Sequence, residues 1–276
     1  MKRNVLRIAL YTDYIDSDYV QKIHEGAWKF CKEQNIELLE FPAGEVDSKT
    51  SHNYQLLSVA SHIKNTNVDG LIFLSATQLY HTTPDSLHTY IKSFSPLPTV
   101  SVGYSFPDIP SVMSDSTKGV TAVITHIIQN HNCRRIALIG VNGNLKDAVE
   151  RTEVYKSVLE ENHIPVDESI LLSGNFTYQS AILSLNAYYE KRKKIDFDAI
   201  VSLNDDMAFA CIDFLRRKNL RVPEDVIVTG FDDVARASIT TPSLTTVNQD
   251  IEGQGYAAAE TVYEMINKKM FLYLRQ

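Results

Sequence analysis

Short apolar runs alternate with longer amphipathic segments along most of the chain. Four runs in the first part have the length and continuous hydrophobicity of buried strands: "VLRIALY" (5–11), "IELLEF" (36–41), "GLIFLS" (70–75) and "PTVSVG" (98–103). Segments with helical periodicity separate them, at about residues 19–34, 51–65 and 84–93. Because buried parallel strands are short and apolar throughout, this alternation predicts βαβ units and a parallel sheet.

The alternation begins again after "IPSVMSDS". The second series contains the predicted strands "RRIALIG" (134–140), "SILLSG" (169–174), "DAIVSL" (198–203) and "DVIVTG" (225–230). Helices are predicted at 116–130, 147–162, 177–193 and 206–218, and a last one at about 249–268 has no strand of its own in the second series. We therefore expect an α/β protein of two halves, one of residues 5–113 plus 248–268 and the other of residues 114–247, with 270–276 as a candidate addition.

Composition narrows the class of protein. The 276 residues are 44% hydrophobic and 22% charged, as in globular proteins with a sizeable core. A net charge of -7 opposes non-specific attraction to nucleic acid, and the densest basic cluster, "EKRKK" at 190–194, is typical of the exposed end of a helix.

The compartment is indicated by cysteine usage and by the absence of targeting patterns. The three cysteines, Cys31, Cys133 and Cys211, are too widely separated for a disulfide framework or a metal site, which favours a reducing cytoplasm. Arg7 interrupts the first apolar run, so that run is too short for a signal peptide. No segment approaches the roughly 20 apolar residues of a membrane span.

Polar residues follow several predicted strands, at the edge where ligands bind in open α/β sheets. They are Asp13, Ser75, Asn204, Asp205, Asp232 and Asp233. Such a residue often caps the next helix, and we favour that interpretation for Asp205 and Asp206. For Asn204 with Asp232 we favour a ligand site, since a hydroxyl-rich ligand needs planar amide and carboxylate groups that bridge its hydroxyls.

The segment "LNDDMAFACIDFLRRKNLRVPEDVIVTGFDD", followed by "PSLTTVNQD", closely resembles the effector-binding domain of the LacI/GalR family of bacterial transcription regulators. "RRIALIG" and "VDGLIFLSA" (68–76) fit the same pattern, so the resemblance covers nearly all of residues 5–268. It implies a periplasmic-binding-protein type I architecture, in which two Rossmann-like subdomains with parallel sheets hold a small ligand in a cleft.

The resemblance also implies which residues bind the ligand. The family's ligand-binding positions fall on Asn204, Asp232, Gln249, Arg151, Phe176 and Tyr19. In such a site Arg151 would donate a fork of N–H groups to sugar oxygens, and Phe176 and Tyr19 would stack on the apolar face of a ring. Both aromatic side chains are equally compatible with a place in the core. Asp13 and Ser75, which end strands of the first half, complete the candidate set.

The chain departs from the family pattern in three places. Val154 replaces a small residue, Gly103 and Tyr104 stand where a charged residue is common, and the N-terminal helix-turn-helix is absent. The far end of the ligand therefore has no assigned partner. DNA binding is expected only through a helix-turn-helix module that this chain lacks.

Other site chemistries have less support. The side chains of two carboxylates that bind a metal ion or act as acid and base must converge on one point. The side chains of adjacent residues such as Asp232 and Asp233 usually point in different directions. The eight histidines show no ligand spacing, and "GVNGN" (140–144) lacks both glycine-rich phosphate-binding patterns, so a turn is the better interpretation. We expect no metal, no cofactor and no enzymatic activity.

The sequence therefore predicts the ligand-sensing and dimerisation domain of a LacI-type transcription regulator. Its expected partners are a small polar effector, such as a sugar, and a second copy of itself. We expect no interaction with a membrane. Two alternatives remain open. One is the sensor domain of a signalling protein with another output module, and the other is a solute-binding protein for sugar transport.

Overall fold

The structure, a computed structural model, describes residues 5–15, 17–48, 53–65, 67–142 and 145–273. By its internal contacts the chain forms two units, the first of Met1–Ser114 with Asp250–Gln276 and the second of Asp115–Gln249. The predicted helix start at 51–52, the end of the "GVNGN" turn at 143–144 and residues 274–276 lie outside the described residues.

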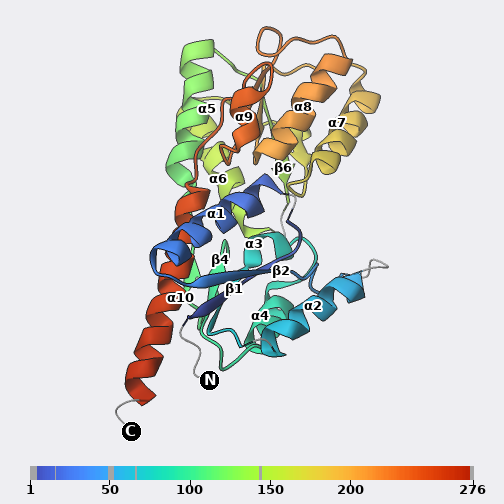
Figure 1. Ribbon diagram of the computed structural model, residues 1–276. Coiled ribbons are helices and arrows are strands. Elements are labelled where there is room, and N and C mark those ends of the chain that lie inside the picture. The colour runs from blue at the N-terminus through green and yellow to red at the C-terminus, as the bar shows by residue number, and fades with distance from the viewer. Residues whose placement is uncertain (1–4, 16, 49–52, 66, 143–144, 274–276) are drawn as a thin grey trace. The chain divides into compact units, whose positions relative to one another are not determined.

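The first unit is built on a parallel sheet with strand order β2-β1-β3-β4-β5 (Figure 1). Its strands are β1 (Arg7–Thr12), β2 (Glu37–Pro42), β3 (Gly70–Leu74), β4 (Thr99–Val102) and β5 (Ser111–Val112). Its helices are α1 (Asp18–Glu33), α2 (Asn53–Asn65), α3 (Ser75–Gln78), α4 (Pro84–Lys92) and α10 (Ile251–Tyr273).

The second unit repeats this plan with the strand order β7-β6-β8-β9, again parallel. Its strands are β6 (Ile136–Val141), β7 (Leu171–Ser173), β8 (Ala199–Ser202) and β9 (Ile227–Thr229). Its helices are α5 (Thr117–His131), α6 (Lys146–Glu161), α7 (Tyr178–Arg192), α8 (Asp205–Arg217) and α9 (Ala235–Ile239), with a 3-10 turn at Glu168–Ile170.

The predicted α/β class with parallel sheets is confirmed. Each predicted strand and helix is present, with ends that differ by a few residues. The sequence did not predict β5, α3 or α9, which have 2, 4 and 5 residues. Elements this short do not complete the periodic pattern from which strands and helices are recognised.

Both faces of the first sheet are buried, which explains why its strands are continuously apolar. Ile8 and Leu10 pack on one face in a cluster with α1 and α10, whereas Ala9 and Tyr11 face a second cluster that includes residues of α2 and α4. Successive side chains of a strand point to opposite faces, so a strand covered on both sides must be apolar at every position.

Two glycines allow α1 and α10 to cross at close range in the first unit. A Cβ on Gly26 would lie 1.8 Å from the carbonyl oxygen of Glu252, and a Cβ on Gly255 would lie 2.1 Å from that of Ile23. Both contacts are with helix backbone, which cannot move aside as a flexible side chain does. The long C-terminal helix therefore reaches the sheet only because these positions lack side chains.

We predict that Gly26→Ala destabilises the protein. Alanine is favoured over glycine in a helix by about 1 kcal/mol, but forcing extra atoms into a packed contact costs about 1–3 kcal/mol or more, so the net effect is a loss. Urea unfolding would measure it, with Glu25→Ala on the exposed side of α1 as the matched control. A stabilised Gly26→Ala variant would contradict the close crossing.

Candidate functional site

The predicted ligand residues of the second unit lie at or near the carboxyl edge of its sheet. Asn204 follows β8 and Asp232 follows β9, while Arg151 is in α6, the helix after β6. The carboxyl ends of parallel strands share one edge, and open α/β sheets bind ligands there. The buried state of these polar residues distinguishes them from ordinary surface groups, since each is at most 8% exposed.

Asp205 holds the turn that carries Asp232. Its carboxylate is fully buried and accepts hydrogen bonds from the Val234 N–H (3.0 Å) and the Thr246 hydroxyl (2.6 Å). A Cβ on Gly230 would lie 2.1 Å from Oδ1 of Asp205, so glycine at this position makes room for the carboxylate. Burial raises the pKa of Asp205 above its ordinary value, and the two hydrogen bonds counteract that rise.

Asn204, not Asp205 or Asp206, caps α8, which corrects the assignment made from the sequence. Oδ1 of Asn204 accepts from the Met207 N–H (3.1 Å), and Nδ2 donates to the carbonyl oxygen of Phe176 (2.9 Å). Both ends of the amide are therefore engaged within the protein. A cap must lie outside the first helical turn with extended backbone, and Asn204 has φ -155° and ψ 171°.

Asp232 occupies an unusual backbone conformation. Its φ is 130° and that of Asp233 is 53°, so two successive residues lie at positive φ without being glycine. The Asp232 N–H donates to the Val247 carbonyl oxygen at 2.9 Å, and Asp233 accepts from Nδ2 of Asn248. These bonds tie the turn to the segment leaving the second unit.

The Asp232 carboxylate has one oxygen engaged and one available. Oδ1 accepts a hydrogen bond from Nε2 of Gln249, and no group in the described part of the chain hydrogen-bonds to Oδ2. Burial raises the pKa of Asp232 to about 8, although the positive charge of Arg151 acts in the opposite direction. A buried carboxylate with a free oxygen is an acceptor suited to a ligand hydroxyl.

Arg151 is held rigidly although it lies on a helix. Its Nη1 donates to the Leu203 carbonyl oxygen at 2.5 Å, and its guanidinium lies 3.7 Å from the centre of the Phe231 ring. The ring of Phe176 is further away, at 5.7 Å from the same guanidinium. Nε of Arg151 is buried without a hydrogen-bond partner, so the fork retains a donor that the described protein groups do not use.

Sequence reasoning missed Phe231 as the residue that supports Arg151. The signal was present, because Phe231 is the aromatic residue of "GFDD" itself and lies between the two acidic residues and a buried strand. A planar guanidinium stacks well on an aromatic face, and this contact fixes its orientation. Phe176 has φ +64° and is 9% exposed, so most of its ring is covered.

The three candidate ligand residues of the first unit differ in burial and in the contacts that their side chains make. Ser75 is fully buried and its hydroxyl pairs with that of Ser101 at 2.8 Å, so this hydroxyl is already engaged within the protein. Tyr19 lies in the first turn of α1, is half-buried and packs against the core. Asp13 directly follows β1, and burial raises the pKa of its carboxyl group, partly offset by the nearby Tyr14 N–H and Thr77 hydroxyl.

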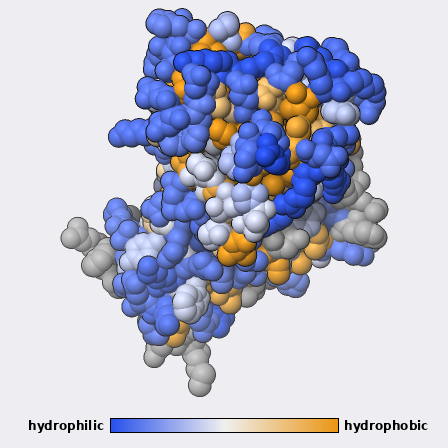
Figure 2. Space-filling view, turned by 90° about the horizontal axis from the view of Figure 1, so that it is seen from above, coloured by the Kyte–Doolittle hydropathy of each residue, from blue (hydrophilic) through white to orange (hydrophobic). Residues whose placement is uncertain are grey.

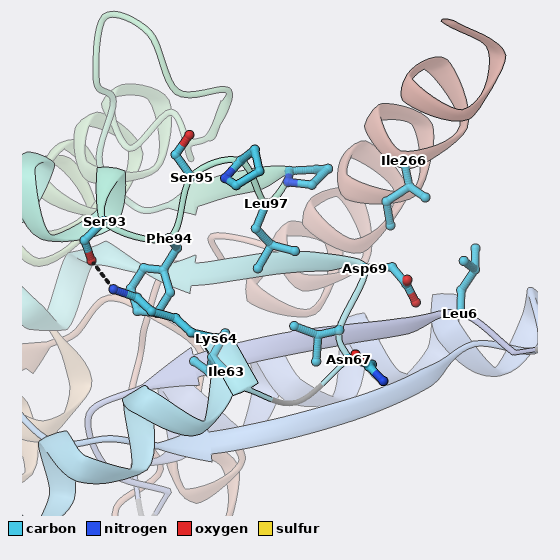
Figure 3. Close-up of a pocket in the computed structure, with 13 residues that line it drawn as sticks. Leu6, Ile63, Lys64, Asn67, Asp69, Ser93, Phe94, Ser95, Leu97 and Ile266 are labelled. Carbon is cyan, nitrogen blue, oxygen red and sulfur yellow. Dashed lines mark hydrogen bonds between the residues drawn. The ribbon is translucent and has the colours of Figure 1, made fainter. Parts of the chain in front are cut away.

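A cavity of about 550 Å³ opens at the opposite edge of the first sheet (Figure 3). Leu6, Asp69 and Pro98, which precede β1, β3 and β4, line it, so it lies at the amino ends of these strands. The other lining residues are Ile63, Lys64, Asn67, Val68, Ser93, Phe94, Ser95, Pro96, Leu97 and Ile266. None of the predicted ligand residues is among them, so this cavity is distinct from the candidate site.

The described residues contain neither a metal-binding cluster nor a membrane-spanning helix. Within them, no group of three or more histidine, cysteine, aspartate or glutamate side chains is arranged to hold a metal ion. None of the helices that the structure describes has both the length and the apolar character needed to cross a bilayer. The face of the molecule drawn in Figure 2 is largely hydrophilic, with smaller apolar areas between the polar ones.

Comparison with known proteins identifies relatives of this chain. The family described as "Periplasmic binding protein-like domain" matches residues 124–270. The HTH-type transcriptional regulator RegA of Clostridium saccharobutylicum is 30% identical over 210 residues, which are 75% of this chain and 60% of RegA. The relatives are transcription regulators, not enzymes, and this chain spans about 60% of the length of RegA.

Two solved structures share the fold. The complex of the transcriptional regulator CelR with cellobiose has a TM-score of 0.76 and 24% identity, and covers 95% of this chain and 78% of that one. A LacI family transcriptional regulator from Enterococcus faecium with bound ribose has a TM-score of 0.76 and 20% identity, and covers 95% of this chain and 90% of that one. Both likenesses establish the fold of this chain.

We predict that Asp232→Asn stabilises the ligand-free protein more at pH 8 than at pH 5. The pKa of Asp232 rises from 3.8 to about 8 on folding, so ionising this carboxyl group lowers the free energy of unfolding progressively between these two pH values. Asparagine has nearly the same shape and does not ionise. Urea unfolding at both pH values would measure the difference.

Asp115→Asn is the matched control for this pH dependence. The Thr117 N–H lowers the pKa of Asp115, so this carboxyl group is ionised in both states at pH 5 and at pH 8 and contributes no change between them. A stability difference between Asp232→Asn and the parent that does not vary with pH would contradict the buried, proton-binding state of Asp232.

Proposed function

The chain belongs to the periplasmic binding protein-like domain family, in the form found in LacI-type transcription regulators, and from this premise we propose that it senses a sugar through Asp232 and Arg151. Asp232 accepts hydrogen bonds from ligand hydroxyls, and Arg151 donates hydrogen bonds to ligand oxygens. Gln249 orients the Asp232 carboxylate, and Phe231 orients the guanidinium. Asn204 supports the site as a helix cap.

The observation that carries this proposal is that Asp232 and Arg151, two neighbouring polar side chains of the second unit that are almost fully buried, each keep a hydrogen-bonding atom that the protein does not use. Asp232 keeps a free carboxylate oxygen and Arg151 keeps a free buried donor. Protein interiors normally pair such groups, because leaving one unpaired costs about 1–3 kcal/mol. A ligand that offers both a donor and an acceptor restores these hydrogen bonds on binding.

Sugars meet this requirement better than most small metabolites. Each hydroxyl both donates and accepts, so neighbouring hydroxyls match a carboxylate oxygen and a guanidinium fork at once. Cellobiose and ribose are the ligands in the two solved structures of the same fold, which supports this class.

The proposed mechanism is a shift between two arrangements of the units. A ligand that binds one arrangement more tightly than the other raises the population of that arrangement. The size of this shift is limited by the difference between the ligand affinities of the two arrangements. In the cytoplasm, the whole protein would transmit this shift to DNA through a helix-turn-helix module outside this chain.

We predict that Asp232→Ala weakens sugar binding by about one to two orders of magnitude. The substitution leaves a ligand hydroxyl without its partner in a buried place, which costs roughly 1–3 kcal/mol. A thermal-shift screen of sugars, with cellobiose and ribose first, would select the ligand for calorimetric titration. Circular dichroism would confirm that each variant is folded.

The matched control for this titration is Asp233→Ala. Asp233 lies next to Asp232 in the same turn but contacts Asn248 and Thr246 of the crossover segment, so its loss should change affinity much less. Equal affinities of the parent and Asp232→Ala would move the ligand site elsewhere and reduce "GFDD" to a turn.

We also propose that the chain forms a homodimer. This proposal rests on the membership of the chain in the family of LacI-type regulators, and exposed large apolar side chains such as Leu183 on α7 and Ile239 on α9 are candidates for the contact. A dimer would let a change within one copy alter the spacing of two output modules.

We expect sedimentation velocity to give a dimer at tens of micromolar, roughly the concentration range in which weak dimers persist. The expected result is a sedimenting species of twice the 31.2 kDa chain mass, with the dimer fraction increasing with concentration. A monomer throughout that range would contradict the dimer proposal and leave the ligand-site proposal intact.

A further inference from the structure

The cavity at the amino edge of the first sheet is formed entirely within the first unit (Figure 3). Its walls come from the segments that lead into β1, β3 and β4, from the end of α2 and from α10. Every lining residue belongs to the first unit, so the second unit has no part in these walls.

The two hydrophobic clusters of the first unit both reach this cavity. Ile266 belongs to the cluster on one face of the sheet, whereas Ile63 and Phe94 belong to the cluster on the other face. Leu6 packs against the first cluster and Leu97 against the second, and both side chains are half-buried. The cavity is therefore walled by apolar side chains from both faces of the sheet.

The volume of the cavity, about 550 Å³, is that of a small-molecule site. Ligand pockets commonly have roughly 300–1,000 Å³, and an apolar cavity of about 150 Å³ is enough to hold benzene. A six-membered ring with a short polar substituent therefore fits within these walls.

Lys64 adds a positive charge to this apolar surrounding. Its Nζ donates to Oγ of Ser93 at 3.2 Å, the bond drawn in Figure 3, and lies 5.1 Å from the centre of the Phe94 ring. Both of these partners are neutral, and no carboxylate of the described residues forms an ion pair with Lys64. An ammonium group has three donor hydrogens, so Nζ can bind an anion as well as Ser93.

A neighbouring cavity of about 310 Å³ provides a contrast. It shares residues 95–98 with the larger cavity and is lined by Lys92 and Asp108. The Lys92 ammonium group forms an ion pair with Asp108. The protein itself thus supplies a negative partner for the lysine of the smaller cavity, whereas the lysine of the larger cavity has only neutral partners.

Asp69 determines where a negative group can lie in the larger cavity. Its Oδ2 accepts a hydrogen bond from the Arg7 N–H at 2.8 Å. Figure 3 shows Asp69 beside Leu6, apart from Lys64. An anion would be repelled by the Asp69 carboxylate and attracted by the ammonium group, so it binds at the Lys64 end.

The apolar walls and the charge of Lys64 together select a class of ligand. A sugar would place its hydroxyls against apolar side chains, and buried hydroxyls without partners are costly. A neutral apolar molecule would leave the Lys64 charge without a negative partner. A ring with a carboxylate satisfies both features, and its rigid body loses less conformational freedom on binding than a flexible chain does.

We propose that this cavity binds a small aromatic carboxylate, with the ring between the apolar walls and the carboxylate paired with Lys64. The site lies in the first unit and uses neither Asp232 nor Arg151. It is a second small-molecule site, and it does not rest on the proposed sugar-sensing function.

Matched acids and amides test the class of ligand. Benzoate, phenylacetate and 3-phenylpropionate, each beside its amide, would be titrated calorimetrically into the whole chain. At least one acid should bind with a Kd of about 1 mM or tighter, more tightly than its amide, and its affinity should fall as salt is added. No binding by any of the acids at about 10 mM, or an amide bound as tightly as its acid, would overturn the proposal.

Lys64→Met tests the role of the charge, because methionine keeps an unbranched side chain without the ammonium group. The acid should bind about two- to five-fold more weakly, as for the loss of an exposed ion pair, and the dependence on salt should disappear. Lys92→Met is the matched control and should leave the affinity unchanged, since Lys92 is paired with Asp108. Parental affinity and salt dependence in Lys64→Met would overturn the proposal.

Leu97→Trp tests the location, because the larger side chain fills part of the cavity. Acid binding should be lost in this variant once circular dichroism shows that it is folded, and parental affinity in the folded variant would overturn the proposal. If the variant does not fold, Lys64→Met decides the question.

Two further results distinguish this site from other uses of the same surface. Asp232→Ala should bind the acid as the parent does, and weaker binding would place the acid at the Asp232 site and contradict the proposal. If no acid binds and Leu97→Trp lowers the dimer fraction in sedimentation, the cavity is a contact between two copies and the proposal is wrong.

Discussion

The buried carboxylate of Asp205 is the interaction on which the candidate site depends. It binds the Val234 N–H and the Thr246 hydroxyl, and it fits because Gly230 has no side chain. These contacts hold the turn in which Asp232 takes a φ of 130°. Burying a charge is costly unless hydrogen bonds compensate it. The carboxylate at this position therefore secures geometry more than it adds stability, and it keeps Asp232 directed to a defined place.

Neighbouring acidic and amide groups in the second unit have separate tasks. Asp205 and Asn204 are fully used by the protein, one in the turn and the other as the cap of α8. Asp232 has one carboxylate oxygen outside its hydrogen bond with Gln249, and Arg151 has a buried Nε without a hydrogen-bond partner. This division explains how one chain segment is both well ordered and able to bind, because the ordering groups are not those that meet the ligand.

The sequence predicted the sheets, the main helices and the strand ends that carry polar residues, because buried parallel strands leave a strong apolar signal. It did not predict which of several adjacent polar residues are satisfied internally. Asn204 has the capping role that was expected of Asp205, Asp205 holds the turn that carries Asp232, and the Ser75 hydroxyl pairs with that of Ser101. These outcomes depend on contacts between segments far apart in the sequence, such as that of Asp205 with Thr246, which local patterns do not contain. Phe231 was visible as the aromatic residue of "GFDD", but the Arg151 guanidinium that lies on its ring was not.

The most direct test of the central claim is a crystal structure of this chain with the sugar that stabilises it most in a thermal-shift screen. The account predicts a sugar hydroxyl within hydrogen-bonding distance of Oδ2 of Asp232, with a second sugar oxygen within reach of the Arg151 guanidinium. A sugar bound without contact to Asp232, for example in the 550 Å³ cavity at the amino ends of the first sheet, would contradict it.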